Sequence, residues 1–366
     1  MKIRKNGVFL LGAGIVLLLI IGSILLFSNK KKEDKMVIGV ILPGSSDEPG
    51  WNGIHYQGIR DACAELGVTM ELYEYAPEYS GECEKAVREM AEKGIKAIVL
   101  ESYNYPDEIE ETIKEYPDIS FYCCSSDRDL DNYKTYFARV YQARYLSGIV
   151  AGMKTKSNHI GYVAAMDNNE VNRGINAFTL GVRSVNPEAV VYVSYTGDWD
   201  NGEKERQEAA ALVNNCRVDV LTYHQNQPFV VGMAEEMGVY VIGYNIDRGE
   251  YSDYLLTSVV SNWNMVYQEI IADYLQNKEI GVRNYWIGIE KDAVGLSFYS
   301  KEVSQEMIDA VEFAADRLRD DKEVFSGLIY DNAGNIRCNE NEVIRDEILQ
   351  QQMNWVVEGV EIYEVN

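Results

Sequence analysis

The sequence predicts an α/β protein built from two lobes, each of them a doubly wound parallel sheet. Its 366 residues are 46% hydrophobic and 25% charged, which is typical of a globular chain with more than one domain. From residue 36 onward, short apolar segments alternate with amphipathic ones, which favours parallel strands connected by helices. The alternation begins again after residue 154, with the apolar run IGYVAA, so we expect a second sheet.

The first sheet is predicted from four short apolar or alternating segments. They lie at residues 36–42, 69–75, 97–100 and 120–124. The segments between them have helical periodicity, at residues 53–66, 81–93 and 106–116, with Gly94 as a helix-ending glycine. This order of elements predicts helices on both faces of the sheet.

The helix predicted at residues 139–152 carries small residues on one face. They recur at four-residue spacing, which allows a close approach to a neighbouring layer: Ala143, Ser147 and Ala151, with Gly148 and Gly152 beside them. A polar joint at 155–158 separates this helix from the strand predicted at 160–165. We therefore expect the first passage between the lobes at this joint.

The second lobe repeats the pattern of the first. Strands are predicted at residues 160–165, 190–195, 218–222, 239–243 and 257–260, and helices at 171–185, 203–214, 228–237, 265–276 and 304–319. We expect three units: residues 1–35, residues 36–154 with about 261–295, and residues 155–260 with about 296–366. Because so few residues separate the lobes, the chain must cross a hinge several times.

The amino-terminal segment is predicted to anchor the chain in a membrane. Residues 7–28 carry no charge, and about 20 apolar residues are enough to span a bilayer as a helix. We see no small-residue cleavage site after this run, which predicts an uncleaved single-pass helix. A short amino end before a large domain favours a folded part outside the cytoplasm.

Charge and cysteine usage exclude several classes of function. Residues 36–366 contain 27 Lys and Arg against 56 Asp and Glu, a net charge of −29. Such a field repels phosphate backbones, so we expect no nucleic-acid partner. The six cysteines form no CxxC motif and share no metal-ligand spacing with the three histidines, so no metal site is predicted.

The predicted ligand site follows from the sheet topology. Ligands of open parallel sheets bind beyond the carboxyl ends of the strands, which selects the loops at 44–52, 101–105, 166–170, 197–200, 224–228 and 245–247. These loops are rich in aromatic and amide side chains: Trp51, Asn52, Tyr103, Tyr105, Trp199, His224, Gln225, Asn226, Asn245 and Asp247. Between facing lobes they would stack a flat ring and hydrogen-bond its edge.

From residue 36 almost to its end, the chain resembles the basic-membrane-protein family of ABC-transporter substrate-binding proteins. The resemblance is densest in YFARVYQARYLSGIVAGMKTK, IGYVAAM, EVNRGINAFTLGVRSVNP, GVYVIGYNID and TSVVSNW. It implies a type I periplasmic-binding-protein fold that clamps a purine nucleoside or an adenine-type base between two lobes. It implies no chemistry and no cofactor.

The resemblance also implies roles for single residues. Trp51 is expected to stack on the purine, Glu170 to accept a hydrogen bond from it, and Asp247 to hold its edge. Trp199 and His224 match an aromatic and a histidine of the family's loops. Asn52, Tyr103 and Asn245 complete the predicted set of ligand-binding residues, which contains no catalytic residue and no metal ligand.

Each of these residues also has an explanation that needs no ligand. A tryptophan at a helix start can act as a hydrophobic staple, and the helix dipole favours a carboxylate such as Glu170. Trp199 can pack on the surface, His224 can be a neutral loop histidine, and Trp263 is expected in the core. The chain also departs from the family: it lacks the usual lipoprotein cysteine, and Asn52 and residues 225–228 differ, which leaves the exact ligand open.

The leading hypothesis is therefore a membrane-anchored, monomeric receptor that delivers a purine base or nucleoside to an ABC permease and its ATPase. The alternative is a sensor or regulator of the same fold, similar to Med, for which an uncleaved anchor is equally suitable. An enzyme is disfavoured, because no strand is followed by a nucleophile elbow, P-loop, dinucleotide fingerprint or His-Glu-x-x-His motif.

Overall fold

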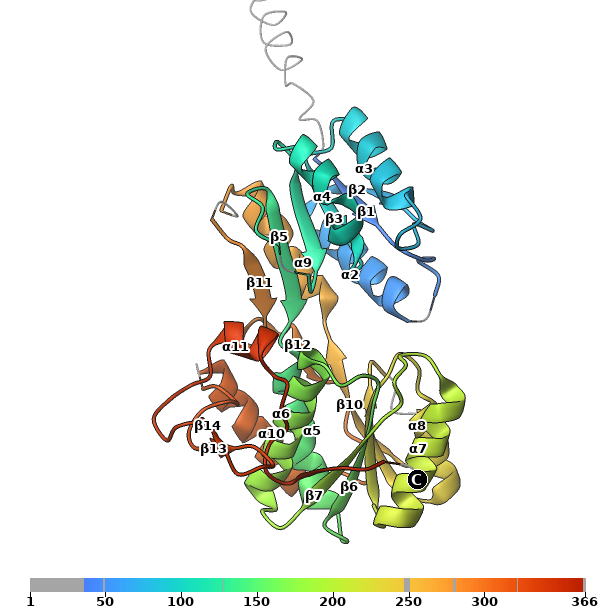
Figure 1. Ribbon diagram of the computed structural model, residues 1–366, viewed down its shortest axis with the longest axis vertical. Coiled ribbons are helices and arrows are strands. Elements are labelled where there is room, and N and C mark those ends of the chain that lie inside the picture. Colours follow the sequence, from blue (N-terminus) through green and yellow to red (C-terminus); the bar gives the residue numbers. More distant parts are fainter. Residues whose placement is uncertain are drawn as a thin grey trace, which may run out of the picture.

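The computed structural model describes residues 36–48, 50–126, 128–246, 251–278, 281–320 and 322–364. These residues form two α/β lobes connected by a narrow hinge, as Figure 1 shows. The predicted α/β architecture with parallel sheets is thus confirmed. The predicted membrane anchor lies in residues 1–35, outside the described residues, and among the described helices none is both long and apolar enough to cross a bilayer.

The first lobe contains a six-stranded sheet in the order β11-β5-β4-β3-β1-β2. Its strands are β1 (Val37–Ile41), β2 (Thr69–Tyr73), β3 (Ala97–Leu100), β4 (Ser120–Cys124), β5 (Tyr133–Ala138) and β11 (Asn284–Ile287). Each strand runs parallel to its neighbours. The first four were predicted. We did not predict β5 and β11, which extend the sheet on the side next to the hinge.

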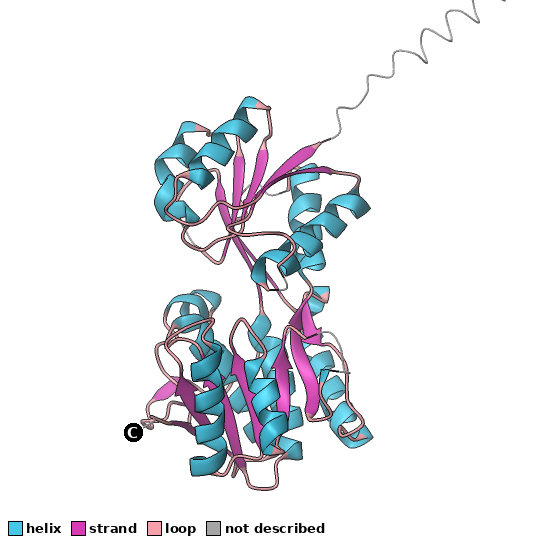
Figure 2. Cartoon of the chain, turned by 90° about the vertical axis from the view of Figure 1, so that its right-hand side faces the viewer, coloured by secondary structure: helices cyan, strands magenta, loops and turns pink. Residues whose placement is uncertain are grey.

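Helices cover both faces of this sheet (Figure 2). On one face α2 (Trp51–Leu66) packs against α9 (Trp263–Leu275), and on the other α3 (Glu82–Glu92) packs against α4 (Tyr105–Glu115). The alternation of β1 explains the two layers, because Val40 belongs to the apolar cluster of α2 and α9 and Ile41 to that of α3 and α4. Both residues are fully buried.

The second lobe contains a seven-stranded sheet in the order β12-β10-β9-β8-β6-β7-β15. Its strands are β6 (His159–Ala164), β7 (Val190–Tyr195), β8 (Val220–His224), β9 (Tyr240–Tyr244), β10 (Leu255–Ser261), β12 (Val294–Leu296) and β15 (Val360–Ile362). In this sheet β12 runs antiparallel to β10, and all other neighbouring strands are parallel. On one face, α7 (Gly202–Cys216) packs against α8 (Phe229–Met237). On the other lie α5 (Val140–Lys154), α6 (Asn169–Val185) and α10 (Gln305–Arg319).

The carboxyl-terminal segment lies against the same lobe. It contains a two-stranded sheet of β13 (Ile329–Tyr330) and β14 (Ile336–Cys338), and α11 (Asp346–Gln351), which contacts α6. The segment then supplies β15, which pairs with β7 at the edge of the second sheet. Residues 360–362 thus form an edge strand of the second sheet, which we did not predict.

Glycines hold α5 and α6 close together. A Cβ atom at Gly181 would lie 2.0 Å from the carbonyl oxygen of Tyr145, and one at Gly148 would lie 2.1 Å from that of Phe178. Because the opposing atoms are backbone, a side chain at either position forces the helices apart. This contact explains the small residues that the sequence places on the face of α5.

We expect Gly181→Ala to lower the free energy of unfolding by about 1–3 kcal/mol or more, the usual cost of overpacking a tight contact. Gly295→Ala is the matched control, since a Cβ there meets no atom within 4 Å. Thermal and urea denaturation of both variants measures the difference. Equal stability of the two variants would contradict the proposed close contact.

The chain passes between the lobes three times. The passages lie after β5, after β10, and between β11 and β12 by way of η2 (Ile289–Lys291). They are hydrogen-bonded to one another: Arg139 N donates to Ile287 O at 2.8 Å, and Asn262 N donates to Ala293 O at 2.8 Å. This arrangement agrees with a hinge crossed several times.

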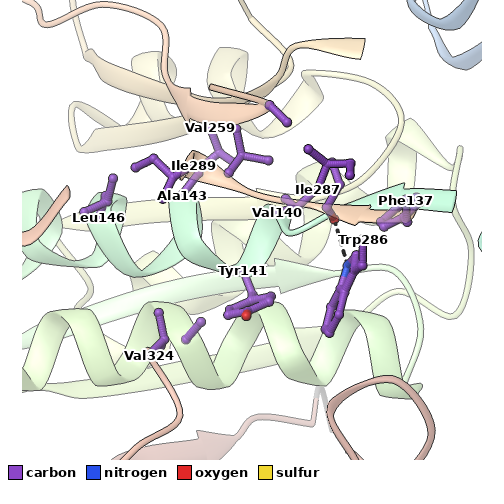
Figure 3. Packing of buried hydrophobic residues seen from close by; sticks show 14 of the residues in the cluster. Phe137, Val140, Tyr141, Ala143, Leu146, Val259, Trp286, Ile287, Ile289 and Val324 are labelled. Atoms are coloured by element: carbon purple, nitrogen blue, oxygen red, sulfur yellow. Dashed lines mark hydrogen bonds between the residues drawn. The ribbon is translucent and has the colours of Figure 1, made fainter. Parts of the chain in front are cut away.

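The packing of α5 at the hinge indicates where the first lobe ends and the second begins. We expected α5 in the first lobe, but it packs against α6 and β10 of the second sheet. Figure 3 shows Val140, Tyr141 and Leu146 of α5 among Val259 of β10, Trp286 and Ile289. We therefore propose that the lobes comprise residues 36–138 with 263–287 and residues 140–261 with 289–364, with the boundaries at the three passages.

Candidate functional site

A cavity of about 1410 Å³ lies between the two lobes. Its lining comes from the carboxyl ends of strands in both sheets and from the hinge, as the topology rule predicts. Seven of the eight predicted ligand-binding residues are among its lining residues: Trp51, Asn52, Tyr103, Glu170, Trp199, His224 and Asn245. The eighth, Asp247, lies outside the described residues.

On the wall formed by the first lobe, Trp51 is part of an aromatic stack. It begins α2, and its indole N–H donates to the backbone oxygen of Glu101 at 2.9 Å. The imidazole of His55 lies between two indoles, with ring centroids 4.1 Å from Trp51 and 3.9 Å from Trp263. Trp51 therefore has one side fixed by the protein, while Trp263 is buried in the core, as expected.

Below this stack lies a fully buried polar cluster that the sequence did not reveal. Glu101 follows β3, and its carboxylate accepts a hydrogen bond from the hydroxyl of Tyr267 and lies 2.9 Å from Nδ1 of His55. Tyr267 is also bonded to His55, at 2.6 Å, and to the hydroxyl of Tyr136, at 3.1 Å. Glu101 is among the residues at the edge of the cavity, but its carboxyl group has no exposed surface and faces this cluster.

This cluster also holds the donors that a metal would need. His55, Glu101 and Cys124 bring one potential ligand atom each to within 4.8 Å of the others, and all three are buried. The hydroxyl of Tyr267 already bonds both His55 and Glu101, so an ion would have to displace it. Burial also holds the pKa of the Cys124 thiol well above its usual range, which keeps the thiol neutral. These contacts favour a hydrogen-bonded protein network at this position.

Asn52 and Tyr103 have different surroundings. The amide nitrogen of Asn52 donates to Glu48 at 2.6 Å and its oxygen accepts from the backbone N–H of Gly44 at 3.4 Å, so this side chain braces the loop after β1. Tyr103 is 57% exposed at the rim of the cavity. Of the two, Tyr103 has the side chain free to meet a ligand.

On the wall formed by the second lobe, three rings pack edge to face. Trp199 follows β7, and its ring centroid lies 5.7 Å from that of His224, which in turn lies 4.9 Å from that of Tyr244. The loop of Trp199 is braced, because its backbone oxygen accepts from Asn226 N at 3.0 Å and Gln225 donates to Thr196. The ring of Trp199 itself is half-buried at the cavity.

Burial and nearby charges act on the protonation of two groups of this wall. Burial, together with Arg144 and Arg173, holds the pKa of His224 well below its usual range, so the imidazole is neutral at physiological pH. Burial raises the pKa of Glu170, while the same two arginines act in the opposite direction. The wall thus presents a neutral imidazole and a carboxyl group on which burial and two guanidinium groups act in opposite directions.

Asn245 directly follows β9 and has a positive φ of 56°, a conformation that asparagine adopts more readily than most residues. Its backbone N–H donates to Val259 O at 2.8 Å, and its exposed side chain lines the cavity. The role expected for Asp247, two residues later, stays a prediction.

Several further lining residues come from elements that we did not predict. Thr135 and Phe137 lie on β5, and Trp286 lies on β11. The guanidinium carbon of Arg139 lies 4.3 Å from the Trp286 ring, and that of Arg173 lies 5.1 Å from it. Because these residues lie at the hinge, only the three-dimensional arrangement of the strands brings them to the site.

Comparison with known proteins agrees with this architecture. Residues 35–326 match the Bmp family, described as ABC transporter substrate-binding protein PnrA-like. The purine-binding protein of Brucella abortus is 28% identical over 332 residues, which are 90% of this chain and 94% of that protein. TsgA13 of Haloferax volcanii, named as an ABC transporter glucose-binding protein, is 31% identical over 315 residues, which are 85% of this chain and 77% of that protein.

Solved structures show the same fold. A transcriptional activator from Bacillus halodurans superposes with a TM-score of 0.69, at 20% identity, over 77% of this chain and 97% of that one. An ABC transporter solute-binding protein from Conexibacter woesei gives a TM-score of 0.65, at 18% identity, over 78% and 97% of the two chains.

The family match confirms the resemblance deduced from the sequence motifs, and with it the prediction of a binding protein and not an enzyme. The matched residues include the six-stranded sheet, the seven-stranded sheet except β15, and all of the cavity lining except Gln350 and Gln351. The chain belongs to the Bmp family of PnrA-like ABC transporter substrate-binding proteins.

Proposed function

We propose that this protein is the extracytoplasmic receptor of an ABC importer and that it clamps a purine base or nucleoside between its lobes. The observation that carries this proposal is the cavity between the lobes, with tryptophans on both of its walls and carboxylates and amides beside them. A flat heteroaromatic ring with polar edges is the ligand for which such a lining is suited.

The polar groups support a neutral ligand. His224 is neutral, and Glu170 brings a carboxyl group to the cavity, whose oxygen accepts hydrogen bonds from ring or amino N–H groups. The net charge of −29 of residues 36–366 repels a phosphate, so we expect bases and nucleosides to bind more tightly than nucleotides. In this proposal Trp51 and Trp199 stack on the ring, and Glu170 and Asp247 bind its edge.

The names of two relatives suggest a different ligand and a different function for this protein. The glucose-binding name of TsgA13 favours a sugar, which aromatic and carboxylate groups can also bind. The Bacillus subtilis transcriptional activator Med, 21% identical over 273 residues, favours a regulator of the same fold. A permease and ATPase that bind this protein would support transport, and their absence would support regulation.

Isothermal titration calorimetry of residues 36–366 against adenine, adenosine, AMP and glucose tests the proposal. We expect heat from adenine or adenosine, quenching of tryptophan fluorescence, and little binding of AMP or glucose. Heat from glucose alone would overturn the purine assignment. No heat from any of the compounds would overturn the purine assignment as well. The anchor at residues 1–35 and the monomeric state are part of the same proposal.

A further inference from the structure

Arg144 is a charged side chain buried without adequate partners. It lies on α5, shortly after the first passage between the lobes, and none of its surface is exposed. Among the described residues, its Nε and Nη2 have no hydrogen-bond partner. Its Nη1 has one long bond, of 3.5 Å, to Oγ1 of Thr222. A guanidinium group in this state is costly, because burial removes its hydration and little replaces it.

The neighbours of Arg144 lie between it and the cavity. Its guanidinium carbon lies 4.5 Å from the ring of Tyr244 and 5.5 Å from that of Tyr162. Tyr244, His224 and Glu170 line the cavity, whereas Arg144 is not among the lining residues. The cation–π contacts compensate only part of the lost hydration. Arg144 therefore lies directly behind the wall that faces the proposed ligand.

The charge of Arg144 also acts on two residues of that wall. Burial raises the pKa of Glu170, and Arg144 opposes this rise together with Arg173; burial lowers the pKa of His224, and Arg144 adds to this lowering together with Arg173. The titratable and charged groups around it come from four elements: Glu170 and Arg173 of α6, Tyr162 of β6, Tyr223 and His224 of β8, and Tyr244 of β9.

We propose that Arg144 is a positioning residue of the ligand site. It holds the ring of Tyr244 in place, and from behind the wall its charge determines which hydrogen bonds Glu170 and His224 can offer to a ligand. It touches no ligand itself. The free-energy cost of burying the charge of Arg144 is then offset by its contribution to ligand binding, and not by a contribution to the stability of the fold. This inference rests on the proposed purine-binding function.

Two effects follow for Arg144→Met, which replaces the charge with an apolar chain of similar length. The melting temperature stays the same or rises, because an uncompensated charge is removed from the interior. Adenine affinity falls, and it falls more at pH 6 than at pH 8. The reason is that the pKa values of Glu170 and His224 both rise without the neighbouring charge, so that lowering the pH protonates them and alters their hydrogen bonding.

The test measures adenine binding by calorimetry at pH 6, 7 and 8, and thermal unfolding, for the wild-type protein, Arg144→Met and Arg144→Lys. We expect Arg144→Met to lose about tenfold more affinity at pH 6 than at pH 8, and Arg144→Lys, which keeps the charge, to follow the wild-type pH profile. Arg144→Gln provides the same test if Arg144→Met does not fold.

Two results would overturn the inference. One is an Arg144→Met protein with the affinity and pH profile of the wild type. The other is an equal loss of affinity at every pH in Arg144→Met and Arg144→Lys, together with a lower melting temperature in both, since this indicates a purely structural role. If the wild-type protein itself binds no adenine, the proposed function fails, while the melting temperatures still report whether Arg144 stabilises the fold.

Discussion

Replacement of Trp199 by alanine is expected to weaken purine binding roughly 5- to 150-fold, since stacking on one aromatic ring contributes about 1–3 kcal/mol. Trp199 is the better of the two tryptophans for this test. Among the aromatic rings of the described residues, its half-buried ring has one edge contact, with His224, and the hydrogen bonds that brace its loop come from the backbone and from other side chains. Removal of its ring should therefore leave the fold intact.

The same substitution at Trp51 would be harder to interpret. Its indole N–H is bonded to the backbone of Glu101 and its ring is stacked on His55, so Trp51→Ala also disturbs the first lobe. Trp199→Phe is the conservative control and should retain most of the affinity. Phe313→Ala removes an aromatic ring that is 67% exposed and not among the lining residues of the cavity, so it should have no effect. Unchanged binding by Trp199→Ala would exclude the proposed stacking.

The loops at the site were predictable from the sequence because parallel sheets impose a simple rule. The carboxyl ends of all strands lie at the same edge, so loops far apart in the chain meet there. Trp51, Glu170 and Trp199 could thus be assigned to one site before any contact was known, and all three line the same cavity. The purine-binding role of these residues stays a prediction.

The polar cluster of the first lobe could not be predicted in this way. Its members lie on α2, α9, β5 and the loop after β3, and they meet only because α2 packs on α9. Nothing in the local pattern distinguishes Tyr267 from other aromatic residues of an apolar helix face. Arg144 is similar, because it lies within a helix whose small residues dominate the pattern.

The membership of α5 illustrates a different limit. Its periodicity correctly predicted a close-packed helix, but periodicity does not say which sheet a helix covers. The glycine contacts between α5 and α6 link it to the second lobe. The strands β11, β12 and β15 have only three or four residues each, too few for an alternating pattern to emerge.

Closure of the lobes on the ligand is the second large effect that we expect. The cavity of about 1410 Å³ exceeds the 300–1,000 Å³ of sites that bury a small ligand. A purine can therefore touch both walls only if the lobes approach each other. The three passages that connect them form a hinge about which such a rotation is expected.

Small-angle X-ray scattering of residues 36–366, with and without saturating adenine, measures this closure. We expect the radius of gyration to fall on binding, toward the value of about 20 Å of a compact chain of this length. The Trp199→Ala protein at the same adenine concentration is the control and should show a smaller change. An unchanged radius of gyration, with adenine binding demonstrated by calorimetry in the same sample, would contradict the claim that the ligand is clamped between the lobes.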